Sequence, residues 1–287
     1  MSPLLAALAL QVAEPGAVVG LCRFDVERLS FAGTPAEQAR CLMQPVGKRG
    51  VLAASPKHLP GTLSRVMAGR VPLPGRNVLT RLLAVERMDI GGVDQPVSRA
   101  RDGDPSAPLA RYFVIHDTST PYYGDEPFPA DIDGDVRVNS FRPYFPANAD
   151  PEKFPVAHLF LNRIGQVLVG QSLSRPWRAT KLETRVIGLP AKGLFLHIET
   201  VMPRRRDPAV EGWNDAIAPN PGFSARQYDR LAILYIALSV RAGGWLIPAQ
   251  HATMDHGLPQ AHDDPQNFRI KDFDRALHRR LRALSRD

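Results

Sequence analysis

Proline is the residue that most constrains the fold of this chain. The 287 residues include 27 prolines, about twice the usual share of roughly 5%. Because proline lacks a backbone N–H and fixes φ, it is excluded from helix interiors and central strands. We therefore expect short helices and strands connected by long, stiff loops. The length allows one large domain, or one domain with a substantial extension.

Basic residues exceed acidic residues in this chain. There are 36 Lys and Arg against 29 Asp and Glu, for a formal net charge of +7. A positive surface favours anionic partners such as nucleic acids and cell-wall polymers. The basic residues are scattered and no familiar nucleic-acid-binding motif is present, so we expect no nucleic-acid partner. No apolar run reaches the roughly 18 residues that a membrane span requires, so we expect no transmembrane segment.

Two features bear on localisation. The segment 4–10 (LLAALAL) is similar to a short signal-peptide core, although no Lys or Arg precedes it and it could equally begin a helix. Cys22 and Cys41 could form a disulfide in an exported protein, or could remain two buried thiols. Together these features suggest a periplasmic or secreted protein.

The character of the chain changes near residue 104. Residues 99–108 (RARDGDPSAP) are polar, contain Gly and Pro, and lack apolar periodicity, which predicts a linker or exposed loop. We place a boundary there, between an N-terminal extension of unknown role (residues 1–104) and a second unit (residues 105–287).

Most of the predicted regular structure lies after this boundary. A helix over 223–242 is indicated by helical apolar spacing, by a capping box of Ser224 and Gln227, and by glycines at its end. A basic amphipathic helix is predicted at the C-terminus. The other predicted elements are a helix over 34–43 and strands over 111–116, 157–162, 166–170 and 194–201. This mixture predicts an α/β fold with a central mixed sheet flanked by helices, plus an N-terminal extension or small subdomain.

Histidine and aspartate gather at two places that could share a metal ion. His116 ends an apolar strand and enters a polar turn, and residues 251–265 (HATMDHGLPQAHDDP) form a predicted loop with three His and three Asp. Two imidazoles and one carboxylate are a common catalytic zinc set, which leaves a fourth position for a water of pKa near about 7. Spacing alone does not choose between His251, His256 and His262.

Five segments carry a resemblance to a known family. In order they are FVIHDTSTP, AHLFLNRIGQVLVG, LFLHIETV, FSARQYDRLAILYIAL and the final H…DP…FD cluster. The set resembles the zinc-dependent N-acetylmuramoyl-L-alanine amidase family, which includes peptidoglycan recognition proteins and phage amidase-type lysozymes. The similarity covers residues 111–275 and leaves the first hundred residues unexplained.

The resemblance implies a role for individual residues. His116, His251 and Asp264 are expected to bind Zn²⁺. Glu199 stands where the family places a catalytic acid/base. His262 stands where the family often has a lysine that stabilises the oxyanion; a neutral histidine donates from one side only, so its protonation should matter more.

Other residues are candidates for the pocket wall. His197 should share a face with Glu199 and line the pocket, whereas His158 could bind substrate or be a hydrogen-bonded wall residue. Trp177 could stack on a sugar or pack in the core. Asp117 could orient an imidazole or cap the turn after the strand.

The chain also departs from the family pattern. Residues 177–180 (WRAT) replace a Trp-His-Ala-Gly type of segment, so a histidine found near the substrate in some relatives is missing. The segment 122–155 is longer than a compact member needs, which suggests a modified groove. A small misalignment would make His256 and Asp263 the ligands.

The implied activity is hydrolysis of the amide bond between N-acetylmuramic acid and L-alanine of peptidoglycan. The expected partner is peptidoglycan or a muropeptide, and the sequence does not indicate an oligomeric state. Two alternatives stay open: a module that binds peptidoglycan without cutting it, and a zinc amidase that cuts another amide of the stem peptide.

Overall fold

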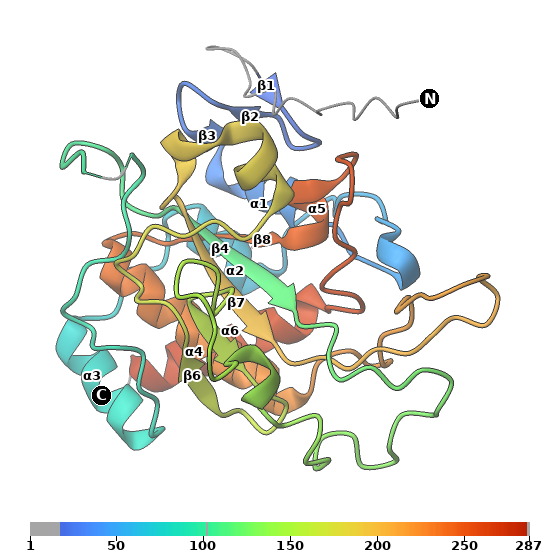
Figure 1. Ribbon diagram of the computed structural model, residues 1–287. Helices are drawn as coiled ribbons and strands as arrows, with labels where there is room; N and C mark the ends of the chain where they lie inside the picture. The colour runs from blue at the N-terminus through green and yellow to red at the C-terminus, as the bar shows by residue number, and fades with distance from the viewer. Residues whose placement is uncertain (1–17, 102, 286–287) are drawn as a thin grey trace, which may run out of the picture.

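The computed structural model describes residues 18–101 and 103–285 (Figure 1). The candidate signal-peptide core at 4–10 lies outside the described residues. None of the helices in these ranges combines the length and the apolar character needed to cross a membrane.

A five-stranded sheet of order β6-β5-β7-β4-β8 forms the centre of the fold. Strands β5, β7, β4 and β8 are parallel, and β6 pairs antiparallel with β5. The fold is therefore mixed α/β with a mixed sheet, as the sequence predicts at this level. The strands are β4 (Tyr112–Asp117), β5 (Leu159–Leu161), β6 (Val167–Val169), β7 (Phe195–Thr200) and β8 (Ile247–Gln250).

Two long helices lie side by side behind the strands in the view of Figure 1. Helix α4 (Ala225–Ala242) begins at the predicted capping box of Ser224 and Gln227 and ends at Gly243, which adopts the left-handed conformation. Helix α6 (Ile270–Leu284) buries its apolar face, including Phe273. Both predicted helices are confirmed.

The two faces of the sheet have different neighbours. Tyr112 on β4 pairs with Phe195 on β7, and their rings stack with centroids 5.0 Å apart. The next residue, Phe113, packs against α4 on the opposite face. Because side chains alternate along a strand, His116 and its register partner Glu199 share the face of Tyr112, away from α4.

Small N-terminal elements cover that face and the β8 edge. Phe24 and Phe31 pack against the Phe195 ring, and α1 contacts β8. The capping box of Thr34 and Glu37 begins α1 as predicted. These elements are β1 (Val18–Val19), β2 (Phe24–Asp25), β3 (Ser30–Phe31), α1 (Pro35–Leu42), α2 (Gly61–Met67) and α3 (Arg76–Val85).

One hydrophobic core contains residues from both sides of the expected boundary at residue 104. The buried Tyr112 hydroxyl accepts from the Phe31 N–H at 3.0 Å and lies 2.9 Å from Gln38 Oε1. Near the boundary, Ala100 and Ala107 are buried. The N-terminal elements are therefore part of the same packed structure.

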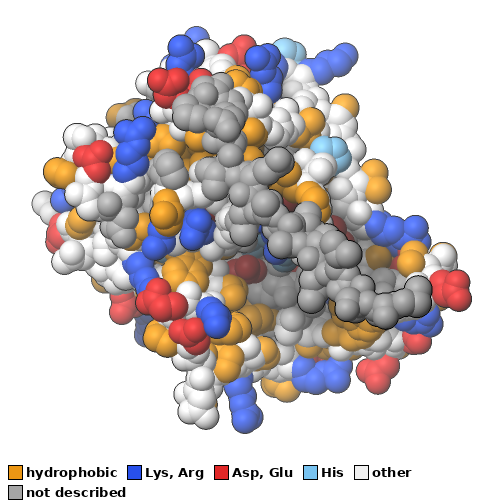
Figure 2. All heavy atoms as spheres, turned by 45° about the horizontal axis from the view of Figure 1, so that its top comes forward, with side chains coloured by type: hydrophobic (Ala, Val, Ile, Leu, Met, Phe, Trp, Pro, Cys, Tyr) orange, Lys and Arg blue, Asp and Glu red, His pale blue; other side chains and the backbone are white. Residues whose placement is uncertain are grey.

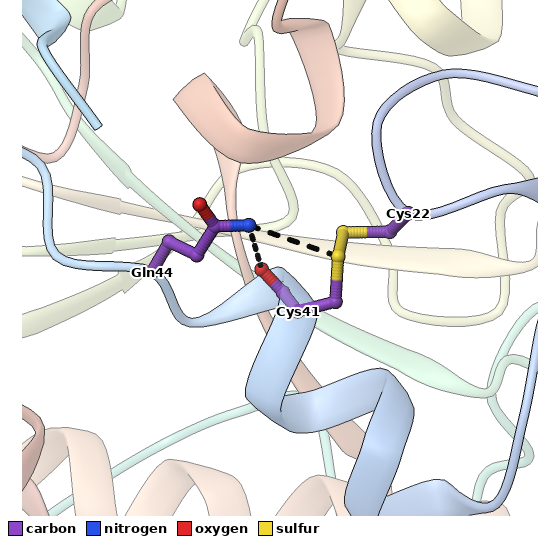
Figure 3. The surroundings of a disulfide bond; sticks show 3 residues. All are labelled: Cys22, Cys41 and Gln44. Atoms are coloured by element: carbon purple, nitrogen blue, oxygen red, sulfur yellow. Dashed lines mark hydrogen bonds between the residues drawn. A yellow bond between two sulfur atoms is a disulfide. The ribbon is translucent and has the colours of Figure 1, made fainter. Parts of the chain in front are cut away.

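Cys22, in the turn between β1 and β2, forms a disulfide with Cys41 on α1 (Figure 3). The Gln44 side-chain amide donates to the Cys41 carbonyl at 3.1 Å. Of the two alternatives for these cysteines, the structure has the disulfide.

The remaining regular structure consists of short helical turns. All of residues 122–155 are described, and one turn is the only helix within them, so this segment is the long irregular loop that the sequence predicts. The short elements are η1 (Lys48–Gly50), η2 (Arg142–Tyr144), η3 (Leu182–Ile187), η4 (Leu189–Ala191) and α5 (His251–Asp255).

Charged side chains are dispersed on the face shown in Figure 2. Lys and Arg are spread there among acidic and apolar side chains rather than gathered in one patch.

Candidate metal centre

The candidate site lies at the carboxyl ends of three neighbouring parallel strands. His116 is near the end of β4, Glu199 near the end of β7, and His251 directly follows β8. This edge of a parallel sheet is where ligands commonly bind.

The prediction of a loop at His251 is wrong, because this residue begins α5. The preceding run IPAQ contains Pro248, which argues against a central strand. β8 is an edge strand that pairs with β4 alone, so proline is tolerated there.

His116, His251 and Asp264 form a buried group that can hold a metal ion, with candidate ligand atoms all within 4.8 Å of one another. The two Nδ1 atoms are 2.9 Å apart. Asp264 places Oδ1 3.0 Å from Nδ1 of His251 and Oδ2 3.9 Å from Nδ1 of His116. Ligands of a tetrahedral zinc lie about 3.3 Å apart, given bonds of about 2.0 Å. The three side chains therefore surround one point.

The donor set fits a divalent metal such as zinc. Each histidine directs Nδ1 to the common point because its Nε2 is engaged elsewhere. Nε2 of His251 lies 2.9 Å from Oδ2 of Asp255, and Nε2 of His116 lies 3.0 Å from Nδ1 of His197. Two imidazole nitrogens and one carboxylate leave a tetrahedral ion with one further position.

The electrostatics of this group favour ligand forms. Burial, followed by the neighbouring rings of His251 and His197, lowers the pKa of His116 well below its usual value. Burial opposes ionisation of Asp264, but His251 outweighs it and holds the pKa of Asp264 well below its usual range. A neutral His116 and an ionised Asp264 are the forms that bind metals.

His251 behaves differently from His116. Burial disfavours its charged form, but the carboxylates of Asp264 and Asp255 outweigh burial and raise the pKa of His251 well above its usual value. A metal ion must therefore displace a proton from this ring, so we expect metal binding to release protons.

Asp264 is held by the end of β4. The Asp117 N–H donates to Oδ2 of Asp264 at 2.9 Å. The Asp117 carboxylate accepts from the fully buried Arg204 at 2.8 Å and from the Ser119 N–H at 3.0 Å. Of its two expected roles, Asp117 takes the turn-capping one, and it also anchors the loop that carries Asp264.

A pocket of about 870 Å³ opens onto the metal group, and Glu199, His262 and Trp177 are among its lining residues. Oε1 of Glu199 lies 3.9 Å from Nδ1 of His116. Its Oε2 is buried without a hydrogen-bond partner among the described residues. Burial, followed by the charge of Asp264, raises the pKa of Glu199 well above its usual value.

His262 lies on the exposed side of the group. Its ring stacks on His251 with centroids 4.5 Å apart, and its Nδ1 is 3.4 Å from Oδ1 of Asp264. About half of its side chain is exposed, so it faces both the group and the pocket.

His197 and His158 lie behind the site and are not among the residues that line the pocket. His197 shares the face of Glu199, as expected, but stands two register pairs deeper in the sheet, opposite Val114. His158 is fully buried; its Nδ1 accepts from the His197 N–H at 3.0 Å, and its Nε2 lies 3.1 Å from the Arg175 carbonyl. Both histidines are therefore internal supports rather than substrate contacts.

The alternative ligands fall outside the metal group. His256 is exposed, and Asp263 lies against Arg204 and accepts from the Gln266 side chain at 2.6 Å. Trp177 lines the pocket with its ring mostly buried, and its indole N–H donates to the Val156 carbonyl.

Three buried residues that support the site were not predicted: Glu183, Arg204 and Asp255. Asp255 follows His251 by four residues, a spacing that brings side chains together on a helix, so recognition of α5 would have indicated it. Glu183 and Arg204 reach the site from distant segments and carry no such local signal.

Comparisons of the chain with protein-family models, curated proteins and solved structures found no match.

Proposed function

We propose that this chain is a zinc-dependent amidase that hydrolyses the bond between N-acetylmuramic acid and L-alanine in peptidoglycan. The observation that carries the proposal is the convergence of His116, His251 and Asp264 on one point, with Glu199 beside it and a pocket in front. The ordered motifs that resemble the N-acetylmuramoyl-L-alanine amidase family supply the substrate class.

The reaction is assigned to residues 105–287, which contribute every proposed ligand and catalytic residue, and residues 1–104 are assigned as an extension. The fold proposed for this unit is the amidase-like one.

A zinc ion at this site would supply a Lewis acid for the amide carbonyl and a nucleophilic water at neutral pH. Glu199 is the general acid/base, taking a proton from the attacking water and returning it to the leaving amine. Its raised pKa suits the second of these transfers, because the protonated carboxyl is the proton donor.

His262 is the oxyanion donor. Its Nδ1 lies 3.4 Å from Oδ1 of Asp264, and about half of its side chain is exposed. A neutral ring donates from one nitrogen only, whereas the imidazolium form can donate to the developing oxyanion while its Nδ1–H faces Asp264.

We propose a periplasmic or secreted location. The disulfide between Cys22 and Cys41 supports it, because disulfides persist in oxidising compartments. The net charge of +7 also favours contact with anionic wall polymers.

The test is hydrolysis of purified peptidoglycan, with the products identified by mass spectrometry. We expect release of stem peptides with a free L-alanine amino group, loss of activity with a chelator, and recovery on adding zinc. His116→Ala should lose both zinc and activity. Glu199→Gln should keep zinc and lose about 10²–10⁴-fold in kcat, the usual contribution of general acid/base catalysis.

The alternatives give different results. Products cut at another amide of the stem peptide would keep the zinc chemistry and change the substrate. A protein that binds peptidoglycan equally well with and without zinc, and releases nothing, would be a recognition module. Wild-type activity in Glu199→Gln would overturn the role of Glu199.

A further inference from the structure

Two buried carboxylates stand behind the two metal-binding histidines. Oδ2 of Asp255 is 2.9 Å from Nε2 of His251. Oε1 of Glu183 is 3.3 Å from Nε2 of His197, whose Nδ1 is 3.0 Å from Nε2 of His116. Asp255, Glu183 and His197 are all fully buried and lie outside the residues that line the pocket.

The chain of contacts from Glu183 to His116 has one consistent pattern of protons. A carboxylate only accepts hydrogen bonds, whereas a neutral imidazole has one donor and one acceptor nitrogen. With Nε2–H of His197 directed at Glu183, Nδ1 of His197 is an acceptor. It then accepts from Nε2–H of His116, and the Nδ1 lone pair of His116 faces the metal point.

The opposite pattern places lone pairs against each other. If Nδ1 of His197 carried the proton, its unprotonated Nε2 would face Oε1 of Glu183 at 3.3 Å. The first pattern is therefore the stable one. Asp255 sets the same pattern for His251 in a single step, so both ligand rings present Nδ1.

Oε1 of Glu183 and Nε2 of His197 are buried and have no hydrogen-bond partner in the described part of the chain. The two atoms face each other at 3.3 Å. An unpaired buried polar group is costly. The other oxygen, Oε2, accepts from the Thr180 N–H at 3.1 Å and from the Thr180 hydroxyl at 2.8 Å.

The same short segment braces both histidines. Asp255 accepts from the N–H groups of Lys181 and Leu182, at 3.1 and 2.9 Å. The next residue is Glu183, which reaches His197. Residues 180–183 thus fix the carboxylate behind each ring, although no local sequence pattern connects them to either histidine.

We propose that Glu183, acting through His197, and Asp255 are positioning residues that hold the rings of His116 and His251 with Nδ1 toward the metal. The inference rests on the metal centre of the proposed function and is independent of the substrate. Partners of this kind fix the tautomer and orientation of a ligand ring.

The experiment measures zinc affinity of the full chain by competition with a chelating dye. Glu183→Gln keeps a side-chain oxygen for Thr180 but places an amide NH₂ against Nε2–H of His197. The amide NH₂ cannot accept the hydrogen bond from this N–H. We expect zinc binding to weaken about 10–100-fold, the usual effect of losing such a partner. Asp255→Asn should weaken it likewise.

The matched control is Thr184→Val, which removes a hydroxyl bond in the same segment, to the Thr180 carbonyl at 2.8 Å, and leaves the contacts of the Glu183 carboxylate in place. It should lower Tm without changing zinc affinity. Cobalt substitution adds a spectroscopic measurement: the visible absorption of the bound Co²⁺ should shift in Glu183→Gln and stay unchanged in Thr184→Val.

Folded Glu183→Gln with wild-type zinc affinity and an unchanged cobalt spectrum would overturn the role of Glu183. If this variant does not fold, His197→Phe is measured instead, with the same expected weakening and the same refuting result. Wild-type protein that binds no zinc would instead overturn the metal centre of the proposed function.

Discussion

The N-terminal residues and the rest of the molecule share one core but differ in what they bury. Among the described residues before 105, the buried side chains are apolar or neutral polar, such as Gln38 and Thr62, and none is charged. After residue 105, charged or titratable side chains are buried in number, including Glu183, Arg204 and Asp264.

Burial of a charge is expensive unless it is paired and hydrogen-bonded. Glu183, Arg204 and Asp264 lie around the metal group, where each has a partner or faces the metal point. Arg241, elsewhere, donates to the carbonyls of residues 90, 95 and 96. The N-terminal elements therefore contribute to stability, while the part of the core after residue 105 holds the candidate metal centre. Four predictions test this division.

Removal of residues 1–104 should have the largest effect. It would expose Tyr112 and Phe195, which are now fully buried, and would leave the face of the sheet uncovered. Because the net stability of a domain is only about 5–15 kcal/mol, we expect residues 105–287 alone to be insoluble or unfolded. Circular dichroism and solubility measure this, and a soluble fragment with a cooperative thermal transition would contradict it.

Loss of the disulfide should destabilise the protein without touching the site. Cys22 and Cys41 are 19 residues apart, and closing a loop of about this length contributes about 3 kcal/mol. The double variant Cys22→Ser and Cys41→Ser should therefore have a lower Tm and unchanged zinc affinity. Reduced wild-type protein is the control. Weaker zinc binding in either sample would show that the N-terminal elements also affect the metal centre.

Gly50→Ala should affect both stability and zinc binding, because Gly50 lies where the N-terminal part contacts the loop that carries Asp264. Its φ is +68°, and an added Cβ would lie 2.7 Å from Cβ of Asp263. We expect a loss of about 1–3 kcal/mol from the backbone conformation and weaker zinc binding from the displaced loop.

Gly69→Ala is the matched control for Gly50→Ala, since Gly69 has the same φ of +68° and no atom within 4 Å of an added Cβ. Gly69→Ala should lower the stability of the protein and leave its zinc affinity unchanged. Equal zinc affinity in both variants would show that the two parts are uncoupled at this contact.

Asp207→Asn should have the smallest effect. Asp207 joins Lys48 and Arg49 to the second part of the chain, but both basic side chains are half exposed and exposed pairs contribute little. Hydrogen bonds from Lys48 and Arg49 lower the pKa of Asp207. Its contribution is therefore present above the ordinary aspartate pKa of about 3.9 and is lost as pH falls below it.

Thermal unfolding at several pH values measures the Asp207 effect. The difference in Tm between wild type and Asp207→Asn should be small near neutral pH and should disappear in acid. A difference that grows as pH falls would have the wrong sign for this ion pair.

Local patterns in the sequence predict several elements well. The capping boxes at Thr34 and Ser224 begin α1 and α4, and the apolar run before His116 forms β4. β8 was missed because it is four residues long and contains Pro248, which only an edge strand accommodates.

By itself, the sequence determined the mixed α/β class and the two places where metal-ligand residues gather, because capping, periodicity and composition act within a few residues. Only the tertiary structure shows which of the three histidines lies beside His116: it is His251, which is 135 residues away in the sequence. The tertiary structure likewise placed Glu183 behind His197. These pairings depend on strand order and register, which arise when distant segments pack together.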